Sequence, residues 1–205
     1  MSATSLPTRL AQLYLGLGCF GVSLALMVRA RLGLGPWDVL HQGLAERLGL
    51  RIGWVVIGVG AAVMLAWIPL RERPGIGTLS NLVVIGLVAD AALNLIGEPG
   101  PLAARIALLA AGIVGTALGT GLYIGAGLGP GPRDGLMTGL ARRGWSIRAV
   151  RTGIEVTVLA LGFLLGGSVG IGTVAFALGI GPLVHVALPL FARGGPTSRP
   201  EGEAA

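Results

Sequence analysis

The chain has 205 residues, of which 53% are apolar and only 12% are charged, and its mean hydropathy is +0.82. These values lie outside the range of soluble globular domains and predict an integral membrane protein. All 15 basic residues are arginines at the edges of apolar runs, so the net charge of +6 indicates contact with the lipid bilayer and argues against nucleic acid as a partner.

Six segments are predicted to cross the membrane as helices. They cover residues 10–29, 52–70, 77–97, 104–126, 147–166 and 172–192. Each is close to the roughly 20 residues that a helix needs to span the hydrocarbon core. The expected fold class is therefore an all-α membrane protein. Its predicted parts are a short N-terminus (1–9), a first membrane unit (10–97), a linker (98–103), a second membrane unit (104–192) and a disordered tail (193–205).

The two membrane units share a motif, which indicates an internal duplication. The segment GLGPWDVLHQGLAERLG at 33–49 has a second version, GPGPRDGLMTGLARRG, at 129–144. A shift of 96 residues aligns nine identical positions within fifteen, and GIGT at 75–78 recurs at 170–173. Three crossings per unit is an odd number, so the second unit would enter the membrane from the opposite side, as in transporters with inverted repeats.

The inversion depends on the short segment after each first helix. If that segment crossed, each half would have four crossings and the copies would be parallel, but Asp38, His41, Glu46 and Arg47 make crossing expensive. The segment is amphipathic, so two placements stay open. It either lies in the headgroup layer with Trp37 as an interfacial anchor, or it re-enters the bundle.

The shared GxGPxD pattern is typical of the start of a helix after an irregular turn. Its residues are Gly33, Gly35, Pro36 and Asp38 in the first unit and Gly129, Gly131, Pro132 and Asp134 in the second. One interpretation is purely structural, because a carboxylate in the first turn stabilises a helix by about 0.3–1 kcal/mol. The other is a substrate-binding site, since two half-helix starts near mid-membrane form a site for ions or polar groups.

Four ionisable residues within the spans are candidates for proton or ion coupling. Arg151 and Glu155 lie four residues apart and can pair, whereas Asp90 and His185 occupy matching positions in the two units. The alternatives are a packing ion pair for the first two and proximity to water for the others. His41 is expected to be solvated. No cofactor is indicated, and no cluster of His, Cys, Asp and Glu has the spacing of a metal site.

Arginine placement indicates the orientation of the chain. With six crossings, ten arginines lie on the side of the N-terminus. Five, namely Arg29, Arg31, Arg47, Arg51 and Arg105, lie on the other side. The bias places both termini in the cytoplasm. Four of the five flank the first GxGPxD segment, where they either face a cavity or pair locally.

The combination of GLGPWDVLHQGL, GPGPRDGLMTGLARR, WSIRAVRTGIEV and the two GIGT turns resembles the YczE/YitT-type bacterial multipass membrane proteins, over residues 10–192. The absence of an extra C-terminal domain is similar to the short YczE-like members. The resemblance implies a protein of the bacterial inner membrane, in a family whose members are treated as transporters without an established activity. It implies no agreed functional residues.

The leading hypothesis is a secondary transporter or exporter of a small organic molecule, with a central site built from the two GxGPxD elements. A homo-oligomer is compatible with this hypothesis. The alternative is a non-transporting accessory of a membrane-bound assembly. An enzyme is not expected, because motifs such as GxSxG, a P-loop or HExxH do not occur.

Overall fold

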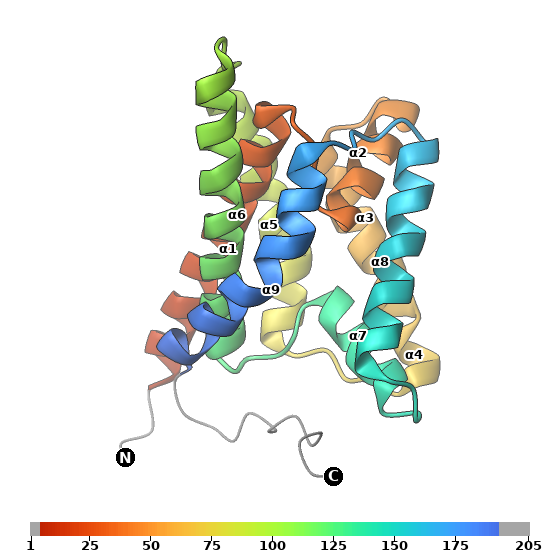
Figure 1. Ribbon diagram of the computed structural model, residues 1–205. Coiled ribbons are helices and arrows are strands. Elements are labelled where there is room, and N and C mark those ends of the chain that lie inside the picture. Colours follow the sequence, from red (N-terminus) through yellow and green to blue (C-terminus); the bar gives the residue numbers. More distant parts are fainter. Residues whose placement is uncertain (1–4, 193–205) are drawn as a thin grey trace.

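The computed structural model describes residues 5–192, and within that range it is helical without strands. The long helices are α1 (Leu6–Ala30), α3 (Ile52–Leu65), α5 (Ile76–Leu95), α6 (Leu102–Gly125), α8 (Ile147–Leu164) and α9 (Ile171–Phe191). The short ones are α2 (Pro36–Leu48), α4 (Trp67–Leu70) and α7 (Pro132–Ala141). They form one bundle, with α2 and α7 near opposite ends (Figure 1). The predicted all-α class is confirmed, and the predicted disorder of 193–205 lies outside the described residues.

Five segments within residues 5–192 are long and apolar enough to cross a membrane. They are α1, the stretch Ile52–Leu70 formed by α3 and α4, α5, α6 and α9. The sixth predicted span, α8, has 18 residues but carries Arg148, Arg151 and Glu155. Its crossing therefore stays a prediction.

Two helices begin before the predicted membrane spans. The first helix begins at Leu6, within the predicted N-terminal segment 1–9, because Pro7 occupies its first turn, where a proline is well tolerated. The fourth predicted span begins at Leu102, inside the predicted linker 98–103, directly after Pro101.

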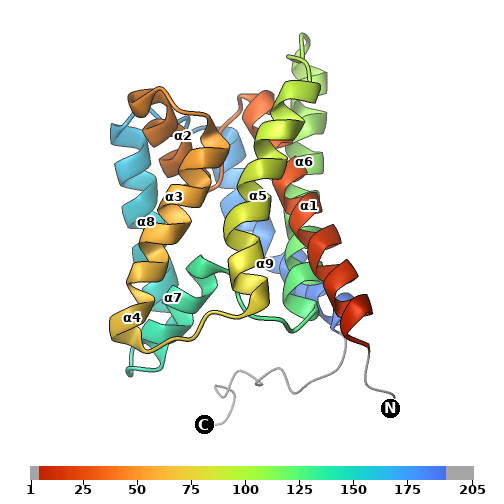
Figure 2. The ribbon, with the colours of Figure 1, turned by 180° about the vertical axis from the view of Figure 1, so that it is seen from behind.

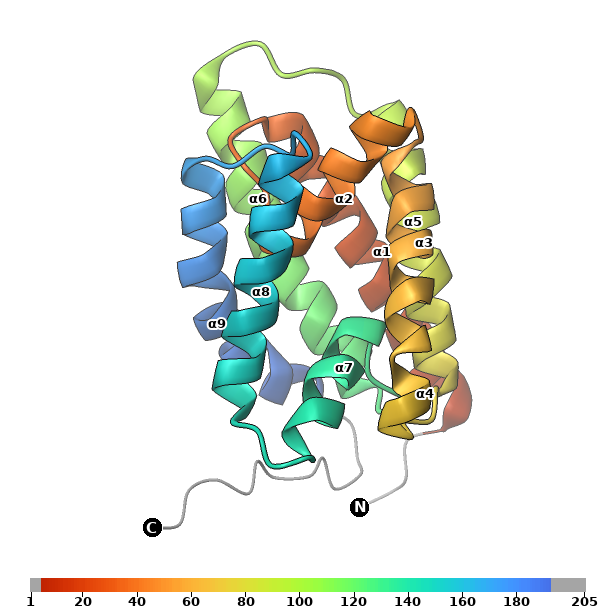
Figure 3. The ribbon, with the colours of Figure 1, turned by 90° about the vertical axis from the view of Figure 1, so that its right-hand side faces the viewer.

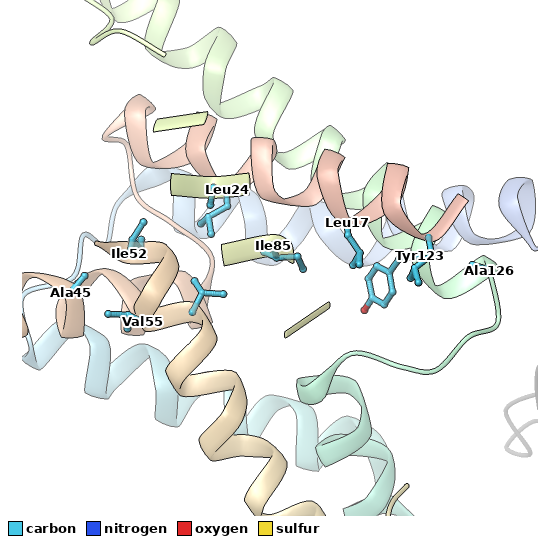
Figure 4. Close-up of a cluster of buried hydrophobic side chains, with 11 residues drawn as sticks. Leu17, Leu24, Ala45, Ile52, Val55, Ile85, Tyr123 and Ala126 are labelled. Atoms are coloured by element: carbon cyan, nitrogen blue, oxygen red, sulfur yellow. The ribbon is translucent and has the colours of Figure 1, made fainter. Parts of the chain in front are cut away.

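Helices α1 and α6 pack extensively against each other on one side of the bundle (Figure 1). The thiol of Cys19 donates to the Gly115 carbonyl oxygen at 3.3 Å, and the side chain of Gln12 donates to Leu122 O at 3.0 Å and Phe191 O at 2.8 Å. Helix α5 packs on α1, and α9 packs on α6 (Figure 2). The apolar core beside α1 is shown in Figure 4 and includes Leu17, Leu24, Ile85 and Ala126.

The two short helices begin inside the bundle and run outward to its ends (Figure 3). In α2, Pro36 to Val39 are buried, whereas Glu46 to Leu48 are exposed. In α7, Pro132 and Gly135 are buried. Of the two placements left open by the sequence, this burial supports the one in which the segment re-enters the bundle. Each short helix packs on a long helix of the other half: α2 on α8, and α7 on α3.

The second and third long helices pack together differently in the two halves. Helix α3 lies so close to α5 that a Cβ at Gly86 would collide with the carbonyl oxygen of Gly53. By contrast, α8 packs on α2 and α7 and has few contacts with α9. The bundle is thus closed between α3 and α5 and less closely packed at the corresponding place in the second half.

Two arginines donate hydrogen bonds to the C-terminal ends of α6 and α1, and each arginine comes from the opposite half of the chain. Arg9 donates from Nε to Ala126 O at 2.8 Å and from Nη2 to Gly127 O at 2.5 Å. In the same way, Arg105 donates to Ala30 O at 2.8 Å and Arg31 O at 2.6 Å. Carbonyl groups in the last turn of a helix lack helical partners, so these bonds stabilise both helix ends.

We therefore expect Arg105→Gln to lower the free energy of unfolding by about 1–2 kcal/mol, since two hydrogen bonds from a charged donor are lost at a partly exposed site. Reversible unfolding in mixed detergent micelles measures the change. Arg148→Gln is the control, because Arg148 is exposed on α8. Equal stability of the two variants would show that the bonds to Ala30 and Arg31 do not stabilise α1.

Candidate functional site

The chain turns back into the bundle before each short helix at a glycine with a left-handed backbone. Gly33 has φ +106° and Gly129 has φ +121°, which are conformations that residues with a Cβ rarely adopt. Two residues after each of these glycines, an extended glycine precedes the proline that occupies the first turn of the helix. The GxGPxD pattern is therefore the start of a half-helix, as the sequence predicted.

Each returning loop is hydrogen-bonded to the last long helix of the opposite half. The amide of Gly77 in α5 donates to Leu128 O at 2.8 Å, and the amide of Gly172 in α9 donates to Leu32 O at 2.7 Å. An irregular backbone inside an apolar bundle needs such partners, because lipid supplies none. The two GIGT turns thus hold the two loops in place.

A threonine in each GIGT turn completes this connection. The Thr78 hydroxyl donates to Pro130 O at 2.8 Å and accepts from the Gly75 amide at 3.1 Å. The hydroxyl of Thr173 accepts from the Gly170 amide at 3.2 Å. Only Thr78 of these two therefore has a side-chain bond to the loop of the other half among the described residues.

The first-turn carboxylates of the two half-helices have different partners. Asp38 is buried, with its Oδ1 at 3.3 Å from Nδ1 of His41 and at 3.9 Å from Nη2 of Arg133. Asp134 accepts a hydrogen bond from the Tyr123 hydroxyl. The Tyr123 ring projects from α6 toward the start of α7 (Figure 4). The two starts are joined through Arg133, which neighbours Asp134 in the chain and contacts Asp38.

The side chains of Trp37 and Arg133 meet between the two half-helix starts. The guanidinium carbon of Arg133 lies 5.3 Å from the centre of the Trp37 ring, a cation–π distance. Both line a small cavity of about 20 Å³, together with His41, Asn81 and Pro132 among others. The indole nitrogen of Trp37 is buried there and has no hydrogen-bond partner within residues 5–192. The Trp37 side chain thus holds a buried donor without a partner and also lines a space large enough for about one water molecule.

Trp67 fixes the second half-helix from the opposite side. Its indole nitrogen donates to Pro132 O at 3.0 Å, and the side chain is 2% exposed. A Cβ at Gly135 would overlap the Trp67 ring, so α7 approaches this tryptophan at a position where only glycine fits. The start of α7 is therefore held by α4 as well as by α5.

The structure corrects one expectation near this site and places two further residues in the interior. His41 is 1% exposed, not solvated, because it lies on the inner face of α2 beside Asp38. Trp37 is 8% exposed and is not an interfacial anchor, since α2 begins inside the bundle. Arg133 lies between the half-helices, because α7 also begins in the interior.

The four predicted coupling residues lie away from this centre. Arg151 and Glu155 form the expected ion pair at 2.9 Å, with the Arg151 side chain 51% exposed. Asp90 accepts from the Gly53 amide at 2.8 Å at the start of α3, and His185 is exposed on α9. The structure therefore joins Asp38 and Asp134 through Arg133, but brings none of the four coupling candidates to them.

Sequence reasoning did not assign the residues that surround the half-helix starts, namely Trp37, His41, Asn81, Tyr123 and Arg133. One signal was available for Arg133, which is charged and directly precedes Asp134 in a motif otherwise expected at membrane depth. No comparable signal marks Tyr123 or Asn81. Among residues 5–192 the structure shows no group of three or more potential metal ligands.

Loss of the Thr78 hydroxyl should loosen the second half-helix. We expect Thr78→Val to lower the free energy of unfolding by about 1–3 kcal/mol, because the side chain is buried and Pro130 O loses its donor. Thr173→Val is the matched control, with a smaller expected loss, since the Thr173 hydroxyl bonds only within its own turn. Unfolding in mixed micelles compares the two. A larger loss for Thr173→Val would contradict the difference in roles.

Comparison with known proteins gives a family for this chain. Residues 7–189 match the model described as "Family of unknown function (DUF6198)". A protein of Haemophilus influenzae is 43% identical over 197 residues, covering 94% of this chain and 90% of the relative. Two Bacillus subtilis proteins also match, "Uncharacterized membrane protein YczE" at 36% identity (83% of this chain, 80% of the relative) and "Uncharacterized protein YyaS" at 28% (88% and 94%).

No solved structure matches the chain. The YczE part of the predicted resemblance is confirmed, whereas the YitT part stays a prediction. With its apolar helices and a family match over nearly its whole length, the chain is a membrane protein that belongs to the YczE-like DUF6198 family.

Proposed function

We propose that this protein is a secondary transporter of a small polar organic molecule, bound where the two half-helices begin. The observation that carries this proposal is the meeting of Trp37 and Arg133 at a cavity inside the bundle. Half-helix starts at the interior of a bundle are the usual setting of substrate and ion sites in transporters. Their amide groups and positive dipole ends favour a negatively charged or hydrogen-bond-accepting group.

The placement of Arg133 supports a binding role over a packing role. An arginine at the centre of a membrane helix costs about 2.5–3.5 kcal/mol on insertion scales, so its retention there needs a compensating interaction. Its carboxylate contact in the described chain is Asp38, at 3.9 Å, which is longer than a direct hydrogen bond. A guanidinium has five N–H donors, so most of the donors of Arg133 remain for a ligand or water.

The site suggests which groups carry protons if transport is proton-coupled. Asp38 contacts His41, and Asp134 accepts a hydrogen bond from Tyr123, so both carboxylates lie at the proposed binding site. The predicted pair of Arg151 and Glu155 lies on the outer side of α8. We therefore assign coupling to Asp38 and Asp134 in place of the four residues selected from the sequence.

We further infer that the two halves are inverted repeats. Matching bonds support this: Arg9 and Arg105 bind equivalent carbonyls, as do the amides of Gly77 and Gly172. A second argument is that Cys19 contacts Gly115, 96 residues away. Trp37 and Arg133 have the same separation, and two equivalent positions touch only at an axis that relates the copies.

Both termini are proposed to lie in the cytoplasm of an inner-membrane protein. At the end of the bundle opposite the N-terminus, three arginines have carboxylate partners. Arg29 and Arg31 form ion pairs with Glu98, and Arg51 lies 3.9 Å from Asp90. These contacts hold these three arginines in local ion pairs. The larger number of arginines lies at the end where α1 begins, which is the arrangement expected for the cytoplasmic side.

The unequal packing of the halves suggests the conformational step. In inverted-repeat transporters, exchange of the two repeat conformations turns one access state into the other. Here α3 packs on α5, whereas α8 has few contacts with α9. The second state would then bring α8 onto α9, at the counterparts of Gly53 and Gly86, which are Ala149 and Gly181.

A cysteine pair tests this step. In a Cys19→Ser background, we expect Ala149→Cys with Gly181→Cys to form a disulfide in proteoliposomes. Ala149 has a Cβ that Gly53 lacks, so α8 would approach α9 less closely than α3 approaches α5, but the two positions would still come within the Cα separation of about 4.4–6.8 Å that a disulfide spans. Mass-shift electrophoresis after mild oxidation measures it. The control pair, Ala149→Cys with Leu178→Cys, should not react, since Val83, the counterpart of Leu178, is exposed beside the α3–α5 contact. Equal yields for both pairs would refute a specific closure.

Flux tests the site itself. Proteoliposomes with an internal pH dye are exposed to a panel of organic acids, amines and amino acids, and we expect one class to drive proton movement. Arg133→Gln and Asp38→Asn should reduce that flux by about 100-fold, if each removes roughly 3 kcal/mol of interaction with the bound molecule. Arg148→Gln should leave it unchanged. Substrate-driven flux that persists in both site variants would remove the assignment.

An accessory role is the second candidate, because Arg148, Arg151 and Glu155 form an exposed charged face on α8 that suits a partner protein. Cysteine labelling separates the two functions in the Cys19→Ser background. If the protein is a transporter, a water-soluble thiol reagent should label Asn81→Cys, because Asn81 lines the cavity. The same reagent should not label Ala25→Cys, because Ala25 is fully buried in α1. Absence of flux across the panel, together with an unlabelled Asn81→Cys, would favour the accessory.

A further inference from the structure

A second cavity lies at the end of the bundle where α1 begins, between α4 and the end of α7. It has a volume of about 690 Å³ and is lined by Arg71, Glu72, Arg73, Arg142 and Arg143, with Pro69, Leu70 and Gly139. Four arginines against one glutamate give the groove an excess of three positive charges. It is separate from the half-helix starts and has no part in the function proposed above.

The groove is partly preorganised by its own contacts. Arg142 pairs with Glu72, and Arg143 donates to the Pro69 carbonyl oxygen. Each guanidinium keeps further N–H groups, because these contacts use one nitrogen of each. For Arg71 and Arg73, no carboxylate within residues 5–192 lies at salt-bridge distance. Four guanidiniums around an open space therefore present donors in the arrangement that phosphate oxygens accept.

The surroundings place this groove at the boundary between lipid headgroups and acyl chains. Leu65 and Ile68, just before the groove residues of α4, are 66% and 73% exposed and provide an apolar surface. Trp145, which follows α7, is 67% exposed, as is typical of tryptophans in the interfacial belt. A molecule in the groove would contact basic side chains at its head and apolar side chains beside it.

We propose that this groove, lined by Arg71, Arg73, Arg142 and Arg143, binds the phosphate-bearing headgroup of an anionic phospholipid, with the acyl chains along α3 and α4. Basic pockets between helices on the cytoplasmic side of a membrane bind such headgroups. The volume accommodates a glycerophosphate group and leaves room for a second phosphate. The lipid would tie α4 to α7 through a bound anion, in addition to the direct bonds of Arg142 and Arg143.

Lipid titration of the full chain in neutral detergent tests the proposal, with native mass spectrometry as the readout and phosphatidylglycerol, cardiolipin and phosphatidylcholine as probes. Phosphatidylglycerol and cardiolipin should bind at least about tenfold more tightly than phosphatidylcholine. The double variant Arg71→Gln, Arg73→Gln should remove that preference. Both substitutions leave Arg142 and Arg143, which bond within the groove, unchanged. Arg47→Gln with Arg51→Gln, at the opposite end, should keep it.

Two outcomes would overturn the inference. The first is an unchanged preference for anionic lipid in the Arg71→Gln, Arg73→Gln variant, provided that its thermal unfolding midpoint in lipid-free detergent matches that of the parent. The second is competition by glycerol phosphate as effective as that by the lipid, which would identify a site for a free phosphate compound. Loss of transport has no bearing on either result, because the measurement reports lipid binding alone.

Discussion

The structure depends on how an apolar bundle satisfies two interruptions of its own backbone. Where the chain turns back at Gly33 and Gly129, amide and carbonyl groups lose their helical partners at a depth where lipid offers no replacement. The carbonyls of Leu32 and Leu128 are each bonded by an amide of the opposite half. Neither half-helix start is therefore supported by its own half alone, and the two copies must fold against each other.

The backbone of the two starts is alike, but the side chains around them are not. Beside Gly35 lies the ring of Phe176, whereas the matching Gly131 lies beside Asn81 and the Tyr123 hydroxyl. The neighbourhood of Gly131 is therefore polar and that of Gly35 is apolar, although the first half-helix has the polar side chains of Asp38 and His41 close by. Since Asp38 has its partners in His41 and Arg133, the polar groups gather on one side of the site.

The sequence predicts the elements of this fold better than it predicts the site. Apolar length locates the long helices, and the GxGPxD glycines and prolines locate the half-helix starts, because both signals act locally. The burial of His41 depends instead on which face of α2 packs against α3 and α8. An amphipathic pattern shows that a helix has an apolar face, but not which other helix covers it. Likewise, Glu155 has the expected partner four residues away, but its outward direction follows from α8 packing on α2 rather than on α9.

The crossed packing of the halves determines which parts can move together. Helix α8 contacts α2 at Gly43, where a Cβ would lie 2.6 Å from Gly162 O, and in the loop after α8 the Ser168 amide donates to Gln42 at 2.9 Å. Close contacts of this kind resist sliding, so we infer that α2 moves with α8 although they belong to different halves. Trp37 lies at the start of α2, and Arg133 lies in α7, which packs on both α3 and α8. A motion of α2 with α8 relative to α7 would change the distance between Trp37 and Arg133, so packing at the periphery is linked to the geometry of the site.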